Sequence, residues 1–195
     1  IGGGKMTRNI INVKPIKDKQ VMLDFLTELK KGKHGKRDHL IFVIGIYTGL
    51  RISDILNLKV SDVQNKTTTV IVEKKTNKQR ELNLSNLTSL IIDYLNSYHD
   101  GQSNWLFYRP SDHSKPLGTH QYYKVLQRVA DTLELDYIGT HTMRKTFGYK
   151  YYRQFRDIPT LMKILNHSSQ AITIRYIGLE EEEIRASLDK FNPLV

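Results

Sequence analysis

The sequence predicts a mainly α-helical protein with a small antiparallel β-sheet, an α+β fold. Apolar residues recur at helical spacing through most of the chain, as where Val21, Phe25 and Leu29 share one face of residues 18–29. One stretch, residues 67–84, instead carries β-branched and alternating apolar residues, which is the period of a strand. A helical body with an inserted hairpin explains both observations.

In the first half of the chain, the predicted elements end at recognisable breakers. The first helix stops at the segment KKGKHGK, and a second, strongly apolar helix stops at Gly49. Two strand-like runs are separated by TNK, which predicts a hairpin. The elements expected here are helices at 18–29, 36–48 and 51–58, strands at 67–75 and 79–84, and a helix at 87–98.

The second half is expected to be helical apart from one short strand. The segment WLFY at 105–108 predicts a third strand, and a polar loop rich in Ser, Pro and Asp follows it. The EEEE run favours the start of a last helix, because anions stabilise a helix N-terminus. Helices are expected at 120–133, 142–155, 159–166, 170–177 and 180–191.

The charge balance favours a polyanionic partner. In 195 residues, 30 Lys and Arg against 20 Asp and Glu give a net charge of +10. This suits nucleic acid, although a solvated basic surface is the alternative. The absence of cysteine excludes disulfides, thiolate metal sites and a cysteine nucleophile. The longest apolar run, residues 40–50, is too short to span a bilayer, so no membrane partner is expected.

Two short motifs place an arginine beside a second functional side chain. In HTMR, His141 and Arg144 share a helix face, where a guanidinium can hold phosphate oxygens and an imidazole can move a proton. In TGLRISD, Arg51 begins a short helix, and Asp54 lies three residues on, where its carboxylate is expected to hold the guanidinium. A surface His–Arg pair or a surface ion pair explains either motif taken alone.

The hairpin tip EKKTNKQR places three lysines, Lys74, Lys75 and Lys78, on a rigid turn. A lysine held there can reach a phosphate or protonate a leaving oxygen. A solvated charged turn is the alternative, and the pattern alone does not choose among the three lysines.

The segment LNHSSQAITIRYIG contains His167 and Tyr176, nine residues apart. In one continuous helix, nine steps of about 100° would put them on opposite faces. Serine is a preferred N-cap, so Ser168 and Ser169 are expected to separate two helices and to let both side chains face one site. Core packing is the alternative role for any one of the 11 tyrosines.

Arginines, histidines, a lysine and a tyrosine without a metal-binding motif suit one reaction in particular. The sequence has no HExxH and no Asp/Glu cluster with cation-ligand spacing, so no metal or other cofactor is predicted. A tyrosine can attack a phosphodiester while cations stabilise the transition state. Because the free phenol has a pKa of about 10, it needs a cationic surround and a proton acceptor. A phosphotyrosine link would conserve the bond energy, so the strand could be rejoined without ATP.

Taken in order, these motifs resemble the catalytic domain of the tyrosine recombinase (phage integrase) family. TGLRISDILNL is similar to the family's first arginine box, THTMRKTFGYKYY to its H-x-x-R box and LNHSSQAITIRYIG to its histidine and tyrosine box. The resemblance runs over residues 18–179. Asn166 stands where the family usually has glycine, and Lys145 where histidine is frequent. The resemblance implies the family's mainly α-helical, DNA breaking-and-rejoining fold.

The resemblance also implies roles for the site residues. In this family the tyrosine is the nucleophile, two arginines clamp the scissile phosphate, a hairpin lysine protonates the leaving oxygen and two histidines assist proton transfer and hold the phosphate. The corresponding catalytic residues here are Arg51, Lys75, His141, Arg144, His167 and Tyr176, with Asp54 in support.

By this resemblance the chain is expected to be a site-specific DNA recombinase or integrase of a mobile genetic element, bacterial or phage-encoded and cytoplasmic. Its implied partners are double-stranded DNA, further copies of itself in a tetramer on the DNA, and accessory DNA-bending proteins. Two alternatives stay open: nicking and resealing of the type IB topoisomerase kind, and a non-cleaving DNA-binding accessory protein.

Three parts are expected along the chain. Residues 1–12 form a flexible N-terminal segment, in which 1–5 are an appended tail, and residues 13–179 form the catalytic domain. Residues 180–195 form a C-terminal helix or tail that packs on its own domain or docks on a neighbouring copy. The family's usual N-terminal core-binding domain does not precede the first helix, so the sequence is expected to be either a separated catalytic domain or a minimal recombinase.

Overall fold

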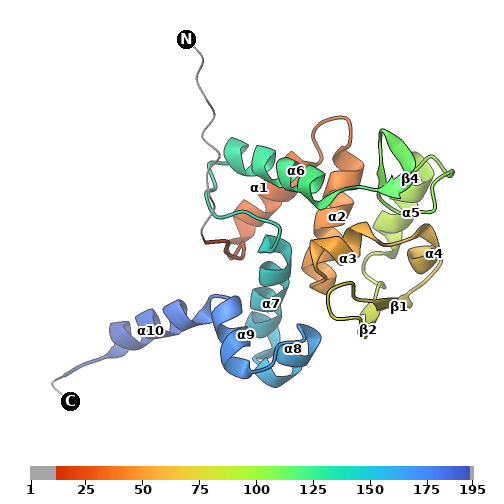
Figure 1. The fold of residues 1–195 in the computed structure, drawn as a ribbon. Coiled ribbons are helices and arrows are strands. Elements are labelled where there is room, and N and C mark those ends of the chain that lie inside the picture. Colours follow the sequence, from red (N-terminus) through yellow and green to blue (C-terminus); the bar gives the residue numbers. More distant parts are fainter. Residues whose placement is uncertain (1–11, 194–195) are drawn as a thin grey trace, which may run out of the picture.

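The computed structural model describes residues 12–193, and the expectations for residues 1–11 and 194–195 lie outside that part (Figure 1). Within the described range the chain forms ten helices and two small antiparallel hairpins. This confirms the predicted fold class. None of the helices in this range combines the length and the apolar character that crossing a membrane requires.

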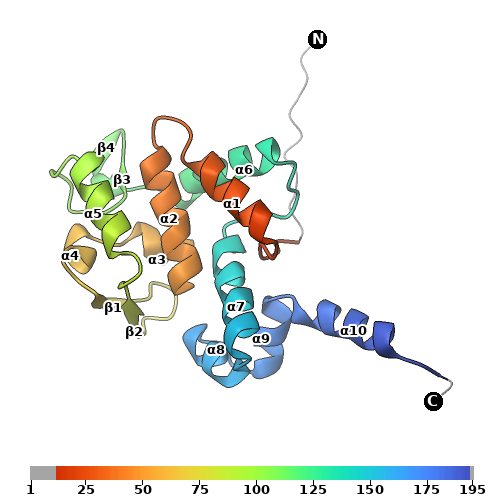
Figure 2. The same cartoon turned by 180° about the vertical axis from the view of Figure 1, so that it is seen from behind.

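The main body is built around α2 (Gly35–Thr48), which α1 (Lys19–Leu29) and α5 (Thr88–Ser97) flank in both ribbon views (Figures 1 and 2). Every residue from position 40 to 44 is buried, because α1, α5 and α7 all pack against this helix. Helix α6 (Thr119–Thr132) closes the body against α1. The strongly apolar run of the sequence is therefore the centre of the core.

Between α2 and α5 the chain forms two short helices and the first hairpin. Helices α3 (Ile52–Leu56) and α4 (Val60–Val63) precede β1 (Thr68–Val72) and β2 (Gln79–Asn83), which pair antiparallel as predicted. Helix α4 is absent from the sequence prediction. It is a single turn that begins where the Lys59 amide donates to the side chain three residues on.

The predicted third strand at WLFY is wrong for all but its last residue, Tyr108. Leu106 and Phe107 are both fully buried, so this run belongs to the core rather than to one face of a sheet. Trp105 makes only an isolated bridge. The strands found here are β3 (Tyr108–Arg109) and β4 (Asp112–Pro116), a hairpin separate from the first, and β4 lies in the segment expected to be a polar loop.

The last helices form a smaller region, the C-terminal cluster. Helix α8 (Ile158–Ile164) packs against the second half of α7 (Thr142–Phe155), α9 (Gln170–Tyr176) packs on α8, and α10 (Leu179–Lys190) extends away from the rest (Figures 1 and 2). The first half of α7 belongs to the main core through Met143. The buried residues of the cluster are Tyr149, Ile158, Leu161, Leu165, Ile177 and Leu179.

Helix α7 joins the two regions because it approaches α2 closely. A Cβ at Gly45 would lie 2.7 Å from the Met143 side chain, so a larger residue on α2 would push α7 away.

The nine predicted helices each lie within two residues of an observed one. The helical architecture that positions the site is therefore encoded locally.

Candidate active site

Helix α8 ends in a Schellman motif that reverses the chain ahead of α9. Asn166 has a left-handed backbone, with φ of 52°. Its N–H donates to the Lys163 carbonyl (3.0 Å), while that of His167 donates to the Met162 carbonyl (3.0 Å). Asparagine tolerates this conformation better than most residues, which explains how it replaces the more usual glycine. The motif fixes the backbone that carries His167.

Ser169 is the N-cap that separates α9 from α8. Its hydroxyl oxygen accepts from the backbone amide of Ile172 at 3.2 Å, whereas Ser168 is an exposed residue ahead of the cap. The break that the sequence predicts is therefore present. It brings the rings of His167 and Tyr176 edge to face, with their centroids 4.9 Å apart.

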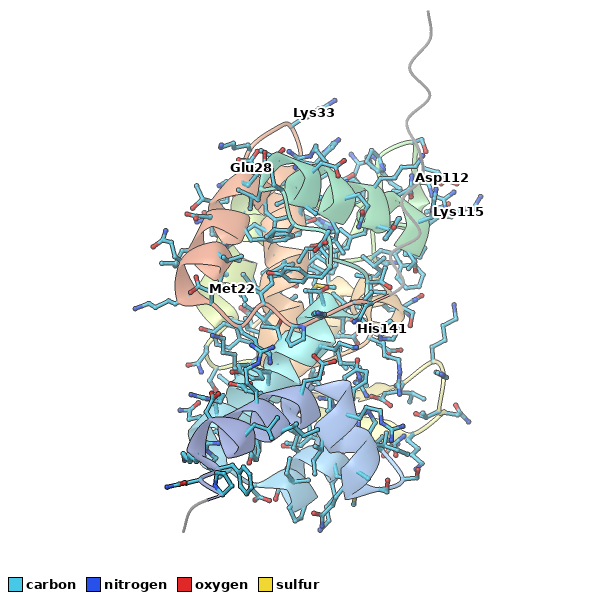
Figure 3. All side chains as sticks on the ribbon, turned by 90° about the vertical axis from the view of Figure 1, so that its left-hand side faces the viewer. Met22, Glu28, Lys33, Asp112, Lys115 and His141 are labelled. Carbon is cyan, nitrogen blue, oxygen red and sulfur yellow. The ribbon has the colours of Figure 1, made fainter. Side chains whose placement is uncertain are left out.

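His141 lies where the main body meets the C-terminal cluster, at the start of α7 (Figure 3). Its Nδ1 is 3.3 Å from the Tyr176 hydroxyl oxygen, so the two side chains can share a hydrogen bond. The Nδ1 of His167 is 3.0 Å from the Thr173 hydroxyl oxygen, which orients its ring against the tyrosine. Tyr176 thus contacts one histidine from α7 and another from the loop before α9.

Arg144 joins the two regions of the molecule with one guanidinium. It is buried, and its two terminal nitrogens donate to the Gly49 carbonyl (2.6 Å) and the Leu165 carbonyl (2.5 Å). Gly49 ends α2 in the main body, and Leu165 ends α8 in the C-terminal cluster. Because Arg144 follows His141 by about one turn, both lie on the face of α7 that meets Tyr176.

Arg51 stands at the N-cap of α3, and its ion-pair partner is Glu73 rather than the expected Asp54. Nη1 of Arg51 is 3.1 Å from Oε2 of Glu73. Asp54 is buried, which raises the pKa of its carboxyl, and its Oδ1 accepts from the Lys74 amide at 2.8 Å. Asp54 therefore holds the hairpin backbone, and the contact with Arg51 that the spacing suggested is made by Glu73.

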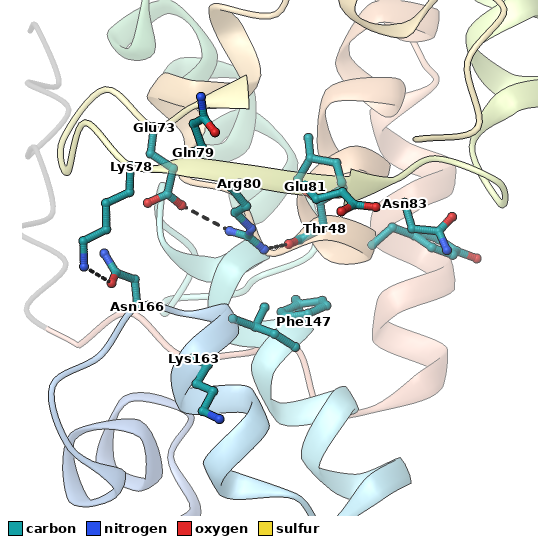
Figure 4. A pocket seen from close by; sticks show the side chains of 13 residues that line it. Thr48, Glu73, Lys78, Gln79, Arg80, Glu81, Asn83, Phe147, Lys163 and Asn166 are labelled. Carbon is teal, nitrogen blue, oxygen red and sulfur yellow. Dashed lines mark hydrogen bonds and ion pairs between the residues drawn. The ribbon is translucent and has the colours of Figure 1, made fainter. Parts of the chain in front are cut away.

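The three hairpin lysines have different surroundings. Nζ of Lys78 donates to the side-chain oxygen of Asn166 (2.9 Å), which ties the hairpin to the loop before α9 (Figure 4). Lys74 is held through its backbone by Asp54. Lys75 is exposed, and its charge is one of several that lower the pKa of His141.

The electrostatics of the site favour a neutral tyrosine and neutral histidines. Burial raises the pKa of Tyr176, and the charges of Arg144 and Arg51 partly offset this effect. Burial, together with the same two cations, lowers the pKa of His167 to about 4. Partial burial and neighbouring cations also lower the pKa of His141. At pH 7 both imidazoles are therefore unprotonated and can accept a proton.

The segment before α1 runs beside the candidate nucleophile. Lys145 donates from Nζ to the Val13 carbonyl (2.8 Å), and the same Nζ lies 5.2 Å from the centre of the Tyr176 ring. Lys17 donates to the Gly178 carbonyl (3.1 Å), two residues after the tyrosine. The N-terminal segment of the described chain therefore contacts two residues near the candidate nucleophile, Lys145 on α7 and Gly178 just after Tyr176.

Beneath the hairpin lies a buried ion-pair group that the sequence reasoning missed. Glu73 also pairs with Arg80 (3.3 Å), and Arg80 donates to the Thr48 carbonyl (Figure 4). The group borders a cavity of about 540 Å³ between the hairpin and helices α7 and α8. Strand alternation offers a signal for Glu73, because it continues the inward-facing positions that begin with Thr69.

The structure brings most of the predicted site residues around one point. The residues that meet there are Arg51, His141, Arg144, His167 and Tyr176, with Lys75 at the edge and Asp54 beneath the hairpin. Residues 12–193 hold no group of three or more His, Cys, Asp and Glu side chains placed to bind a metal ion. The charges of Arg144 and Arg51 act on the Tyr176 hydroxyl, and Nζ of Lys145 lies near its ring.

The architecture is that of the catalytic domains of tyrosine recombinases. The model of the phage integrase family matches residues 16–183. This chain belongs to the phage integrase family.

Similar proteins include both sequences and solved structures. The probable integrase/recombinase YoeC of Bacillus subtilis (strain 168) is 44% identical over 160 residues, which cover 82% of this chain and 87% of YoeC. The site-specific recombinase XerH, solved in a post-cleavage complex with a palindromic difH substrate, matches with a TM-score of 0.70 at 20% identity, over 96% of this chain and 55% of that one. The Tn1549 transposon integrase, solved with transposon right end DNA, matches with a TM-score of 0.69 at 18% identity, over 91% of this chain and 65% of that one. The chain thus spans most of YoeC but about half to two thirds of the two solved proteins.

Proposed function

We propose that this chain is a site-specific DNA recombinase or integrase that breaks and rejoins strands through a covalent 3′-phosphotyrosine on Tyr176. The observation that carries the proposal is the position of the Tyr176 hydroxyl, 3.3 Å from Nδ1 of His141 and beside the charges of Arg144 and Arg51. Membership of the phage integrase family supports the same activity.

Arg51 and Arg144 would bind the non-bridging oxygens of the scissile phosphate. Arg51 donates one N–H to Glu73, and Arg144 donates two to backbone carbonyls. A guanidinium carries five N–H groups, so each arginine retains donors for a phosphate. Two cations fixed in advance would stabilise the charge that grows on these oxygens in the transition state, without a metal ion or ATP.

In the cleavage step, the Tyr176 oxygen attacks phosphorus, and the new P–O bond forms as the bond to the 5′ oxygen breaks. The phenolic proton passes to the neutral imidazole of His141, and Lys75 gives a proton to the departing 5′ oxygen. His167 holds the phosphate from the other side of the tyrosine ring. When a 5′-hydroxyl of another strand attacks the phosphotyrosine, the same transfers run backwards and the strands are joined.

The proposed substrate is double-stranded DNA. The net charge of +10 suits a polyanion, and the Tn1549 integrase, which has this fold, was solved with transposon DNA. Each copy carries one Tyr176, so exchange of both strands between two duplexes needs four copies. We place this tetramer, with accessory DNA-bending proteins, in the bacterial cytoplasm as part of a bacterial or phage mobile element.

Helix α10 supplies a surface for assembly. Ile184, Leu188 and Phe191 are 56%, 67% and 70% exposed, although their spacing is that of one helix face. The first turn of α10 is bound to its own chain, because Glu182 pairs with Lys17 (3.0 Å). The apolar face would therefore dock on a neighbouring copy, while residues 13–179 act as the catalytic domain.

Covalent trapping tests the proposed function. Wild-type protein is incubated with nicked duplexes that carry a randomised central segment, so that the short fragment behind a cleaved phosphate diffuses away and leaves the adduct. We expect a detergent-stable adduct from wild-type protein and from Tyr47→Phe, and none from Tyr176→Phe. Tyr47 is the control because it is exposed and is not one of the residues proposed to act on the phosphate. If no wild-type adduct forms with any member of the pool, the proposed function is wrong.

Strand exchange separates recombination from nicking and resealing. Two duplexes with different labels are built from a sequence recovered in the adducts. Joined products that carry both labels support a recombinase, and relaxation of a supercoiled plasmid without joined products would instead assign a type IB topoisomerase activity.

A further inference from the structure

The buried carboxylate of Glu73 lies at the centre of a hydrogen-bonded group that the catalytic roles above do not use. Its Oε2 accepts from Nη1 of Arg51 (3.1 Å) and from the Thr76 hydroxyl (2.9 Å), and its Oε1 accepts from Nη1 of Arg80 (3.3 Å). Burial alone would raise the pKa of Glu73, but the bond from Thr76 and the charges of Arg51 and Arg80 lower it. The carboxylate is therefore ionised at neutral pH.

One arm of this group restricts Arg51. An arginine side chain that is otherwise free has many rotamers, and an ion pair with a buried acid selects few of them. Arg80, on the other oxygen of Glu73, also donates to the Thr48 carbonyl, three residues before Arg51 (Figure 4). The group is thus anchored to the same α2–α3 connection that carries the arginine.

The other arm restricts the turn that carries Lys75. Thr76, the next residue, donates its hydroxyl to Glu73, and the amide of Lys74, the preceding residue, donates to Asp54 at 2.8 Å. The backbone is therefore held on both sides of Lys75, although the lysine side chain itself is exposed.

We infer that Glu73 is a positioning residue that sets the phosphate clamp and the proton donor in one geometry, holding Arg51 directly and Lys75 through Thr76. The inference rests on the proposed function, because it gives Glu73 no substrate of its own. A carboxylate with only a structural role would affect folding stability. A carboxylate with a positioning role affects the rate of cleavage through two separate contacts, one to Arg51 and one to Thr76.

Three variants divide the two arms. Glu73→Gln keeps the size of the side chain but removes its charge. Its amide nitrogen replaces either the oxygen that accepts from Arg51 and Thr76 or the oxygen that accepts from Arg80, so the ion pair with Arg51 is weakened in both orientations. We expect adduct formation to slow by about 100-fold, the effect of a displacement of about 1 Å at a reacting group, with unchanged non-covalent binding of the same duplex. Glu73→Asp, which keeps the charge, should recover part of the rate, and Thr76→Val should release the Lys75 arm alone. Glu81→Gln, an exposed carboxylate on the neighbouring strand, is the matched control and should cleave normally.

A change of leaving group identifies the arm that is lost. A duplex with sulfur in place of the bridging 5′ oxygen releases a thiolate, whose thiol has a pKa of about 8.5, so departure needs no proton from Lys75. We expect Lys75→Met and Thr76→Val to be slow on the oxygen substrate and close to wild type on the sulfur substrate. Glu73→Gln should be rescued in part, because its Arg51 arm is still released, and Arg51→Met should gain nothing.

The outcomes distinguish the inference from the function beneath it. If sulfur rescues Lys75→Met while Glu73→Gln and Thr76→Val cleave both substrates at the wild-type rate, Glu73 has no positioning role and the proposed function stands. If Glu73→Gln and Thr76→Val cleave slowly to the same extent on the oxygen and the sulfur substrates, the inference is also overturned. If the wild-type protein forms no adduct, the function itself fails. If circular dichroism shows that Glu73→Gln is unfolded, the test uses Glu73→Asp and Thr76→Val instead, and the recovery of their cleavage rates on the sulfur substrate decides the inference.

Discussion

The two regions that meet at the active site rest on cores of very different size. The main body, which carries Arg51 and the lysine hairpin, has one large core around α2. The C-terminal cluster, which carries His167 and Tyr176, has six buried core residues, and α10 projects from it (Figure 2). A region with a small core opens at a lower free energy than one with a large core. Arg51 of the proposed clamp is thus on the firmer region, and the proposed nucleophile is on the more easily moved one.

This difference makes the bonds across the boundary important. Arg144 links the end of α2 to the end of α8, and Lys78 links the hairpin to Asn166. The distance between clamp and nucleophile depends on such contacts and on α7, which packs against α2 and continues into the cluster. Changes at the boundary, in the small core and at the α9 cap should therefore have separable effects.

The largest effect is expected at Arg144, because its loss removes two hydrogen bonds that link the regions. Arg144→Met leaves the buried carbonyls of Gly49 and Leu165 without a donor, at about 1–3 kcal/mol each, so the free energy of unfolding should fall by about 3 kcal/mol or more. Chemical denaturation measures this change, and adduct formation should be abolished. Arg153→Met, an exposed position on the same helix, should change stability by less than about 0.5 kcal/mol. Equal effects of the two variants would show that Arg144 does not join the regions.

The next effect compares the cores directly. Leu126→Ala in the main body and Leu161→Ala in the cluster each remove a fully buried side chain, at a cost of about 2–5 kcal/mol. We expect Leu126→Ala to lower global stability, and Leu161→Ala to speed hydrogen exchange in α8 and α9 while the amides of α2 keep their protection. If α2 loses protection equally in Leu161→Ala, the two regions unfold as one unit.

A smaller effect is expected at the N-cap of α9. Ser169→Ala removes the bond to the Ile172 amide and should cost about 1 kcal/mol, with slower adduct formation because the start of the nucleophile's helix frays. The adjacent Ser168→Ala is the control and should be neutral in both assays. Equal losses in the two variants would mean that the cap does not position Tyr176.

The smallest effect concerns the pH dependence of stability. Burial lowers the pKa of His167 in the cluster and of His39 in the main body from 6.5 to about 4. Between these values the unfolded chain binds more protons than the folded one, so stability falls as the pH falls from 6.5 to 4. His167→Gln and His39→Gln should each flatten this slope, as measured by urea denaturation across that range. A slope unchanged in both variants would show that neither histidine resists protonation in the folded protein.

Much of the fold could be predicted because its signals are local. Gly49 ends α2 with a left-handed backbone, and the side chain of Asp18 caps α1 by accepting from the Val21 amide. The strand predicted at WLFY was wrong because a loop whose adjacent residues are buried in the core has the same composition as a buried strand. Sequence pattern identifies residue types and periods, and these sufficed for nearly all helices.

The residue types of the site could be predicted, but the contacts that hold these residues in place could not. Spacing alone placed His141 with Arg144, and the serine break placed His167 with Tyr176. The contact between Lys78 and Asn166 joins positions 88 residues apart, and Glu73 meets Arg51 only because the hairpin folds back on α3. No local period encodes such meetings, since they depend on how separate elements pack.

The contacts of the segment before α1 also set an order of events during synthesis. The Ile16 amide donates to Thr146, and Lys17 pairs with Glu182, across 130 and 165 positions of the chain. A growing polypeptide folds from its N-terminal part onward, so Arg51 and Lys75 can settle in the main body while these bonds still have no partner. A nascent chain stopped before Ser169 would have the proposed clamp for phosphate but would lack the proposed nucleophile. Under the proposed function, strand cleavage then becomes possible only once synthesis has passed Tyr176, so a nascent chain stopped before that residue would not nick DNA.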